Sequence, residues 1–434
     1  MFKNFSFLNL KLVDVLEANG FREPTKIQTE TIKKFNRDIV VQSQTGSGKT
    51  LAYLIPIANY LYIRSSSMSS IISLIVAPTR ELALQIQKVA DMLNLSSICF
   101  IGGEDATKLE NIKIEASVVI GTPGIINFIV KNHHKDFQKI KYLILDEADR
   151  LLSLNFETQI KSIISHIPRQ NRITGFFSAT INENVRKLAK QTINFIEIII
   201  DEILPSNLVL KYMITQPEHK LNILMNLIEK NKKVIVFFNT CLEVDYFYQL
   251  INKKIFDNKL IKIHGKMKQS DRCEIFKEVI DCDKFVLLCT DVISRGIDIK
   301  NIDLVVHFDI PKESSSIIHR SGRTARNNQV GESILFLMEN ESKYVKYLKI
   351  KEKLKDEEIV EIKTHLPAKD IFDQTEIEDE NLNVKAFVSY LRSYKEHLAN
   401  FVLNIKELNM ESQLKLFKLK KMPIFKEFKR SFKK

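Results

Sequence analysis

The chain has 434 residues, which is enough for two globular domains and an additional segment. Its hydrophobic content of 44% is ordinary, and its apolar runs are short and flanked by polar residues, so we expect buried strands and not membrane spans. Five scattered cysteines without a CxxC pair argue against a disulfide framework and indicate reduced thiols in an intracellular protein. The net charge of +12 favours a polyanionic partner without identifying it.

Short apolar, β-branched runs alternate with longer helical patterns through the first half of the chain. The expected strands are Ile39–Val41, Leu74–Ala77, Val118–Ile120, Tyr142–Leu145 and Thr174–Phe177. Continuous apolar strands separated by helices are typical of a parallel sheet that is covered on both faces. This half therefore predicts an α/β domain over residues 1–203.

The same pattern repeats after the charged, proline-containing stretch DEILPSN at Asp201–Asn207, where we place a hinge. The strands expected here are Val234–Phe238, Lys262–Ile263, Phe285–Cys289, Leu304–His307 and Ser333–Phe336. They predict a second α/β domain with a parallel sheet over residues 204–365.

The composition changes again in residues 366–434. Residues 370–380 carry six acidic and no basic side chains, which indicates a solvated linker, and apolar residues then recur at helical spacing from Val384 to Leu408. Residues 411–434 hold nine Lys or Arg against two Glu, with Phe between the lysines. This tail could be a frayed soluble end or an amphipathic membrane anchor. We favour an RNA-binding extension, in which cations neutralise phosphates and aromatic rings stack on bases.

The stretch QSQTGSGKT at Gln42–Thr50 follows the first expected strand and holds two of the chain's twelve glycines. In a strand–loop–helix arrangement that ends in Gly-Lys-Thr, successive backbone N–H groups surround phosphate oxygens. Lys49 would reach the terminal phosphates, the Thr50 hydroxyl would hold Mg²⁺, and the following helix would add its positive end. Ser43 stands where the general pattern has its first glycine, so the sequence predicts a variant phosphate loop.

A nucleoside triphosphatase also needs a carboxylate pair near the phosphates. The run KYLIL, which is mostly apolar, is followed directly by Asp146 and Glu147. Asp146 would bind Mg²⁺, usually through water, and Glu147 would orient and deprotonate the attacking water.

Three arginines provide the cations that phosphoryl transfer requires. The run HRSGRTAR places Arg320, Arg323 and Arg326 at steps of three, which predicts one helical face. A surface basic helix is the alternative. If these arginines and the phosphate loop form one site, ATP must bind between the two domains.

The four residues Asp146-Glu147-Ala148-Asp149 spell D-E-A-D, and the order of the surrounding motifs resembles that of the DEAD-box ATP-dependent RNA helicases from Phe5 to about Leu337. The other matching motifs are GFREPTKIQ (Gly20–Gln28), SQTGSGKT (Ser43–Thr50), APTREL (Ala77–Leu82), Gly102-Gly103, TPG (Thr122–Gly124), SAT (Ser178–Thr180), VFFNT (Val236–Thr240), QSDR (Gln269–Arg272), TDVISRGID (Thr290–Asp298) and HRSGRTAR (His319–Arg326). The resemblance implies two RecA-like P-loop domains that close together on ATP and single-stranded RNA.

The resemblance also implies a role for each matched position. The catalytic residues would be Glu147, Lys49, Asp146, Arg323 and Arg326. The nucleotide-binding residues would be Phe21, Gln28, Ser43, Gln44, Thr45, Gly46, Ser47, Gly48, Lys49, Thr50, Asp298, Arg323 and Arg326. Among them, Gln28 and Phe21 would contact adenine and Asp298 the ribose. The cofactor Mg²⁺ would be held by Thr50 and Asp146, partly through water.

Two further groups are implied along the RNA side. The RNA-binding residues would be Pro78, Thr79, Arg80, Gly103, Thr122, Gly124, Arg272 and Thr290. Coupling between nucleotide and RNA would involve Ser178, Thr180, Asp149 and Arg320. These contacts would follow the sugar-phosphate backbone and would be independent of sequence. One departure is Ile125, which replaces the usual arginine after TPG and removes one backbone contact.

The C-terminal segment resembles the extension of DEAD-box helicases that assemble the large ribosomal subunit. The match lies in VKAFVSYLRSYKEH (Val384–His397), KKMP (Lys420–Pro423) and FFNTCLEVDYF (Phe237–Phe247). It implies a nucleolar protein that remodels rRNA precursors in large-subunit precursor particles, as a monomer with a possible activating protein partner. An ATP-gated RNA clamp, a general translation-initiation helicase and a DNA translocase are the alternatives.

Overall fold

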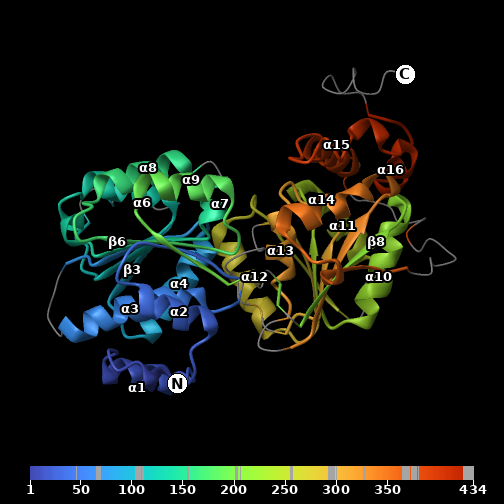
Figure 1. Ribbon diagram of the computed structural model, residues 1–434. Coiled ribbons are helices and arrows are strands. Elements are labelled where there is room, and N and C mark those ends of the chain that lie inside the picture. The colour runs from blue at the N-terminus through green and yellow to red at the C-terminus, as the bar shows by residue number, and fades with distance from the viewer. Residues whose placement is uncertain are drawn as a thin grey trace. The chain divides into compact units, whose positions relative to one another are not determined.

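The computed structural model of the chain (Figure 1) describes residues 1–44, 46–64, 70–102, 109, 112–153, 156–200, 204–205, 207–254, 258–291, 299, 301–325, 329–363, 372, 379 and 381–423. It divides into two compact units, Met1–Ile203 and Leu204–Lys434. Most of the predicted hinge lies outside the described residues, and the division into three domains stays a prediction. No helix in the described ranges is long and apolar enough to cross a membrane.

The first unit is a parallel sheet of seven strands in the order β3-β4-β2-β5-β6-β1-β7. The strands are β1 (Ile39–Gln42), β2 (Ser73–Val76), β3 (Ser97–Phe100), β4 (Val118–Gly121), β5 (Tyr142–Asp146), β6 (Ile173–Ser178) and β7 (Ile196–Ile199). The helices are α1 (Leu10–Ala18), α2 (Lys26–Lys34), α3 (Lys49–Arg64), α4 (Arg80–Met92), α6 (Pro123–Asn132), α7 (Ala148–Ser153), α8 (Glu157–His166) and α9 (Glu183–Thr192).

Helices cover both faces of this sheet, with α6, α8 and α9 on one side and α1 to α4 on the other (Figure 1). Successive side chains of a strand point to opposite faces of the sheet, so one strand contributes side chains to both cores. Ile39 and Val41 pack into the cluster under α1 to α4, whereas Val40 packs into the cluster under α6 to α9. All three side chains are fully buried. The central strands therefore carry apolar residues toward both faces, which is the signal that the sequence carries.

The second unit is also a parallel sheet of seven strands, in the order β10-β11-β9-β12-β13-β8-β14. The strands are β8 (Leu208–Ile214), β9 (Lys233–Phe237), β10 (Lys259–Ile263), β11 (Phe285–Cys289), β12 (Leu304–His307), β13 (Gly331–Leu337) and β14 (Ile359–Glu361). The helices are α10 (Lys220–Lys230), α11 (Cys241–Asn252), α12 (Gln269–Asp281), α13 (Ser315–Ser321), α14 (Lys343–Glu352), α15 (Leu382–Lys395) and α16 (Met410–Leu416). When the strands are renumbered in chain order within each unit, the two sheets have the same order.

The C-terminal extension packs on the second sheet domain through α15 and α16. Phe417, which is 1% exposed, lies among the rings of Tyr246, Phe247, Phe387 and Tyr390, with centroid distances of 5.4 to 5.8 Å. The Tyr246 hydroxyl also donates a hydrogen bond to the Leu416 carbonyl at 3.0 Å. The predicted helical character of the extension is confirmed.

Candidate active site

The phosphate loop joins β1 to α3, as predicted. Gly46 and Gly48 have φ values of +80° and +92°, a conformation that L side chains rarely adopt. A Cβ atom on Gly48 would lie 2.4 Å from the Gln28 Nε2 atom, so a larger residue would also collide there. Thr45 lies outside the described residues. The two glycines are therefore required by the shape of the loop.

Lys49 is the first residue of α3, and its ammonium group turns back into the loop. Its Nζ atom donates hydrogen bonds to the carbonyl oxygens of Ser43 at 2.6 Å and Gln44 at 2.7 Å. The Ser47 hydroxyl donates to the same Gln44 carbonyl at 2.8 Å. The positive charge therefore lies at the N-terminal end of a 16-residue helix, where the helix dipole also favours an anion.

The stretch around Gln28 fixes the phosphate loop from the side. Thr25 caps α2, and Gln28 completes a capping box with it. The Thr25 hydroxyl donates to the Ser47 carbonyl at 2.8 Å, and the Gln28 amide donates to the Gly48 carbonyl at 3.2 Å. Phe21 is half-buried against the neighbouring core. The GFREPTKIQ stretch and the phosphate loop are therefore hydrogen-bonded to each other. The contact of Gln28 and Phe21 with adenine stays a prediction.

The carboxylate pair lies at the end of β5, two strands from β1 in the sheet. Asp146 is 3% exposed and accepts hydrogen bonds from the Tyr53 hydroxyl and the Glu147 backbone N–H, both at 2.9 Å. Burial raises the pKa of Asp146, and the positive charge of Lys49 opposes that rise. Glu147 has a left-handed φ of +48°, a strained conformation that is concentrated at functional sites.

Hydrogen bonds connect this carboxylate segment to the SAT stretch at the end of β6. The Thr180 hydroxyl donates to Asp149 Oδ2 at 2.6 Å, and the Asp149 backbone N–H donates to the Ser178 hydroxyl at 3.4 Å. The Ser178 carbonyl accepts the Ser43 N–H at 3.0 Å. The structure thus brings three of the predicted coupling residues into one network with the phosphate loop.

The predicted RNA-binding residues of the first unit lie at the N-terminal ends of two helices. Thr79 caps α4 through its hydroxyl, and Thr122 is the residue before α6. Because β2 and β4 pair in parallel, these two helix ends follow adjacent strands at the same edge of the sheet. Arg80 begins α4 after the buried Pro78, and Gly124 is exposed in α6. Gly103 lies outside the described residues.

The arginine run of the second unit differs from the prediction. Helix α13 ends at Ser321, so Arg320 and Arg323 do not share a helical face, and Arg326 lies outside the described residues. Gly322 follows the helix and Arg323 begins the turn beyond it. The alternative of a surface basic helix is also wrong, because Arg320 and Arg323 are 0% and 5% exposed.

Arg320 is held by several groups at once. Its Nε and Nη2 atoms donate to the two carboxylate oxygens of Asp291 at 2.6 and 3.1 Å. Nη2 also donates to Asn239 Oδ1 at 3.3 Å, and the guanidinium carbon lies 5.0 Å from the centre of the Phe237 ring. Such an arrangement fixes the guanidinium plane.

Thr290 and Arg272 are the remaining predicted residues of the second unit that the structure describes. Thr290 directly follows β11 and is 7% exposed. Arg272 is in the first turn of α12, where its guanidinium donates a hydrogen bond to the Gln269 side chain. Asp298 lies outside the described residues. We did not predict Tyr53, although its position three residues after Thr50 on one helix places it on the face of the phosphate loop.

Comparison with known proteins covers nearly the whole chain. Residues 25–188 match the model of the DEAD/DEAH box helicase family, and residues 219–328 match the helicase conserved C-terminal domain. The ATP-dependent rRNA helicase SPB4 of Encephalitozoon cuniculi (strain GB-M1) is 42% identical over 422 residues, which are 96% of this chain and 90% of that protein. This chain belongs to the DEAD-box ATP-dependent RNA helicases.

Other relatives of the helicase agree with this assignment. The ATP-dependent RNA helicase DDX55 of Bos taurus is 34% identical over 96% of this chain and 74% of its own length. Residues 380–425 match the C-terminal extension of helicases that resemble the ATP-dependent rRNA helicase SPB4. The extension that packs on the second unit is therefore a feature shared with a subgroup of the family.

Two solved structures show the same fold with nucleotide and RNA bound. Mss116p bound to single-stranded RNA and AMP-PNP superimposes with a TM-score of 0.85 and 26% identity, over 95% of this chain and 90% of that chain. Dbp5 of S. cerevisiae bound to RNA and ADP BeF3 has a TM-score of 0.72 and 26% identity, over 82% of this chain and 94% of that chain. The helicase is an ATP- and RNA-binding enzyme with two tandem RecA-like domains.

The oxygen ligands at the phosphate loop fit a magnesium ion. Asp146 is a buried carboxylate whose negative charge burial disfavours, and Thr50 supplies a hydroxyl at the start of α3. A hard dication that keeps several waters and binds phosphate oxygens suits such a site. In the described ranges, no cluster of three His, Cys, Asp or Glu residues forms a metal cage.

Proposed function

We propose that this helicase uses ATP hydrolysis to unwind or remodel rRNA precursors during assembly of the large ribosomal subunit. The SPB4-like extension at residues 380–425 carries this proposal, because it is the part of the chain that distinguishes this subgroup from a general helicase. The 42% identical relative is named an rRNA helicase. A nucleolar location, a monomeric state and an activating protein partner belong to the same proposal.

In the proposed reaction, the first unit binds ATP and holds the attacking water. The Gly46–Thr50 loop and Lys49 bind the phosphates, and Gln28 and Phe21 bind adenine. Glu147 takes a proton from the water; it is buried and directly follows β5, next to Asp146. Asp146 and Thr50 would hold Mg²⁺, which would supply positive charge next to the phosphates.

The second unit supplies the remaining cations of the proposed reaction. Arg323 and Arg326 stabilise the charge that develops on the transferred phosphoryl group. Asp298 binds the ribose. Arg320 couples this event to the RNA side by holding Asp291, the residue next to the proposed RNA ligand Thr290.

RNA binding is proposed along the carboxyl edges of both sheets. On the first unit, the positive ends of α4 and α6 and the Arg80 side chain suit phosphate oxygens. On the second unit, Arg272 and Thr290 extend the same kind of contact. Such binding is independent of sequence, so we infer that the extension selects the RNA.

Crosslinking by ultraviolet light in cells tests the proposed substrate directly. We would compare the wild type with the Glu147→Gln variant, which should bind ATP and RNA but release RNA slowly. Sharp enrichment of crosslinks at one region of the large-subunit rRNA precursor, stronger in the variant, is the expected result. Crosslinks spread over messenger leader regions would contradict the proposal and favour a general helicase. The Lys49→Ala variant is the control, because its RNA binding should no longer respond to ATP.

Strand displacement on a short RNA duplex separates unwinding from clamping. ATP-dependent release of one strand is expected from the intact chain. ATP-dependent retention of RNA without displacement would instead show a clamp. A DNA duplex of matching sequence, which should not stimulate ATP hydrolysis, is the control for substrate class.

A further inference from the structure

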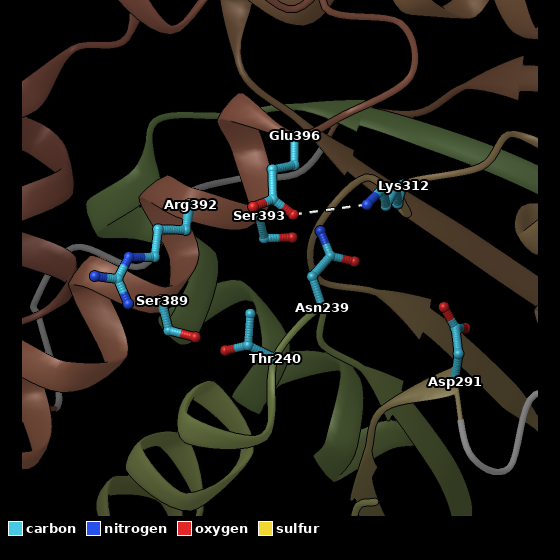
Figure 2. Close-up of a pocket in the computed structure, with 8 residues that line it drawn as sticks. All are labelled: Asn239, Thr240, Asp291, Lys312, Ser389, Arg392, Ser393 and Glu396. Carbon is cyan, nitrogen blue, oxygen red and sulfur yellow. Dashed lines mark ion pairs between the residues drawn. The ribbon is translucent and has the colours of Figure 1, made fainter. Parts of the chain in front are cut away.

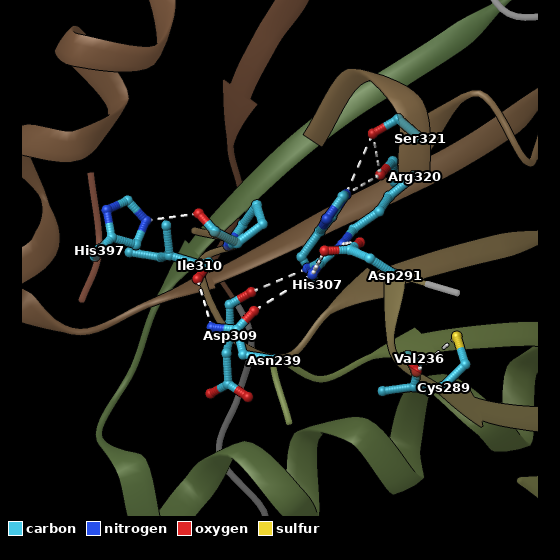
Figure 3. Close-up of polar contacts among 12 residues, drawn as sticks. Val236, Asn239, Cys289, Asp291, His307, Asp309, Ile310, Arg320, Ser321 and His397 are labelled. Atoms are coloured by element: carbon cyan, nitrogen blue, oxygen red, sulfur yellow. Dashed lines mark hydrogen bonds and ion pairs between the residues drawn. The ribbon is translucent and has the colours of Figure 1, made fainter. Parts of the chain in front are cut away.

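One short segment of the second unit is held by five different groups. Phe308–Lys312 lies between β12 and α13 and belongs to neither element. Its five carbonyl oxygens accept hydrogen bonds in turn from Lys220 Nζ (3.0 Å), Arg320 Nη1 (3.4 Å), Asn239 Nδ2 (2.7 Å), His397 Nε2 (2.6 Å) and the Leu398 N–H (3.4 Å). Figure 3 draws Asn239, Arg320 and His397 around this segment.

Two of these five donors, His397 and Leu398, belong to the C-terminal extension. His397 is 3% exposed, and burial lowers its pKa to about 4, so its ring is neutral near pH 7. Its Nδ1 atom accepts the Ala399 N–H at 2.9 Å. The hydrogen must therefore be on Nε2, which donates to the Pro311 carbonyl. Both ring nitrogens are therefore hydrogen-bonded to backbone groups: Nε2 to a carbonyl, which can only accept, and Nδ1 to an N–H, which can only donate.

The segment is connected to the arginine run through Asn239. The Asn239 amide nitrogen donates to the Ile310 carbonyl, while its oxygen accepts from Arg320 Nη2 at 3.3 Å. The Arg320 carbonyl in turn accepts the Arg323 N–H at 3.0 Å. A shift of Ile310 would therefore move Asn239, then the Arg320 guanidinium, and then the turn that carries Arg323.

A polar pocket lies between α15 and the loops that carry Asn239 and Asp291. The pocket has a volume of about 390 Å³ and is shown in Figure 2. It is lined by Asn239, Thr240, Asp291, Lys312, Ser389, Arg392, Ser393 and Glu396. Lys312 and Glu396 form an exposed ion pair across it at 3.6 Å, which contributes little in water. The buried hydrogen bond from His397 to the Pro311 carbonyl is therefore a stronger connection between the extension and this segment than the ion pair.

We propose that His397 is a positioning residue for ATP hydrolysis: from the C-terminal extension it fixes the Phe308–Lys312 segment, and through Asn239 and Arg320 it sets the position of Arg323. The inference rests on the proposed role of Arg323 in the reaction. The extension is anchored separately by the Phe417 aromatic cluster, so loss of the His397 bond leaves it docked. The extension thereby acts on turnover as well as on RNA choice.

Steady-state kinetics of RNA-stimulated ATP hydrolysis in the full chain test this role. His397→Phe keeps a ring of similar size but removes both hydrogen bonds. We expect kcat to fall roughly tenfold, because a small displacement of a catalytic cation is costly, while the KM for ATP changes less than about twofold. His397→Gln should restore kcat, since its amide can donate to Pro311 and accept from Ala399.

Two further variants make the result specific. Tyr344 packs edge-on against His397 at 5.8 Å, and its hydroxyl has no hydrogen-bond partner among the described residues. Tyr344→Phe therefore changes the same buried region without touching the segment, and its kcat should equal that of the wild type. Thermal unfolding of each variant shows whether the fold is kept. If His397→Phe does not fold, His397→Asn replaces it, since the shorter amide cannot reach both partners and should lower kcat relative to His397→Gln.

Arg323→Ala is measured in parallel so that two kinds of failure can be told apart. Unchanged hydrolysis in Arg323→Ala would refute the proposed role of that arginine. Loss of hydrolysis in Arg323→Ala together with full kcat in a folded His397→Phe would overturn the positioning role of His397 alone. Equal kcat values for His397→Gln and His397→Asn would also overturn it.

Discussion

In the first unit, the candidate residues lie on backbone structures that the strand ends and helix starts create: two left-handed glycines, a capped helix and a strained glutamate. In the second unit, the same strand order carries buried charged side chains that hold one another, with Arg320 between Asp291 and Asn239. The same sheet order therefore supports two kinds of site, one built from backbone conformation and one built from buried polar side chains. Substitutions in the first unit should act on ligand binding and chemistry, whereas those in the second should also act on stability.

The largest effect is expected from Glu147→Gln. The amide cannot accept the proton of the attacking water, so kcat for ATP hydrolysis should fall by about 10² to 10⁴, the usual contribution of a general base. ATP affinity should be unchanged, because the phosphate loop is intact. Turnover and nucleotide binding measured on the same preparation check both parts. Unchanged turnover would refute the assigned base.

Arg320→Met should produce the largest loss of stability in the second unit. It removes a fully buried cation, and the Asp291 carboxylate and the Asp309 carbonyl lose their hydrogen bonds to it, which costs about 1 to 3 kcal/mol in free energy of unfolding. Denaturant unfolding monitors this loss. The control is Lys349→Met, which breaks an ion pair with the 94% exposed Asp356 and should cost well under about 1 kcal/mol. Equal losses in the two variants would contradict the comparison of the units.

Gly48→Ala should act on ATP binding. The left-handed φ and the close approach of the Gln28 amide together cost about 1 to 3 kcal/mol, so the KM for ATP should rise roughly tenfold. Gly124→Ala is the matched control, because, apart from its chain neighbours and the backbone of its own helix, no described heavy atom lies within 4 Å of a Cβ at that position. It should leave the KM for ATP unchanged. A normal KM in Gly48→Ala would show that the loop shape is not required.

The smallest effect concerns pH and the second unit. Hydrogen bonds to Asp245 and to Cys241 raise the pKa of His264 from its usual 6.5 to about 9. Because the folded-state pKa lies above the unfolded-state value, this histidine stabilises the fold fully below pH 6.5, and the contribution is lost as the pH rises through 9. Relative to His264→Gln, the wild type should lose about 1 kcal/mol of unfolding free energy between pH 6.5 and pH 9. Parallel pH profiles of the two proteins would contradict this.

The sequence predicted the central strands well because burial on both faces leaves an uninterrupted apolar run. It did not name β3, β7, β8 or β14. Three of these are edge strands, and β7 is only four residues long with Glu197 inside it, so it lacks the uninterrupted apolar run of the central strands. The helical spacing from Val384 to Leu408 likewise did not show that α15 ends at Lys395, after which His397 turns toward the sheet domain.

The motifs of the first unit were also easier to interpret than those of the second. A phosphate loop is local in sequence, so its glycines and Lys49 could be assigned from a single stretch. The environment of Arg320 depends on Asn239, Asp291 and Asp309, which are far apart in the chain and meet only through the sheet order. Spacing of three residues suggested a helix where the chain in fact turns at Gly322.

Single-turnover hydrolysis and nucleotide affinity, measured together for Lys49→Ala and Arg323→Ala, test most directly the claim that the units contribute differently. We predict that Lys49→Ala weakens binding of a nonhydrolysable ATP analogue at least about tenfold. Arg323→Ala should leave that affinity within about twofold and lower the hydrolysis rate by about 10² or more. An Arg323→Ala variant that hydrolyses ATP at the wild-type rate, or that loses affinity as severely as Lys49→Ala, would contradict the account.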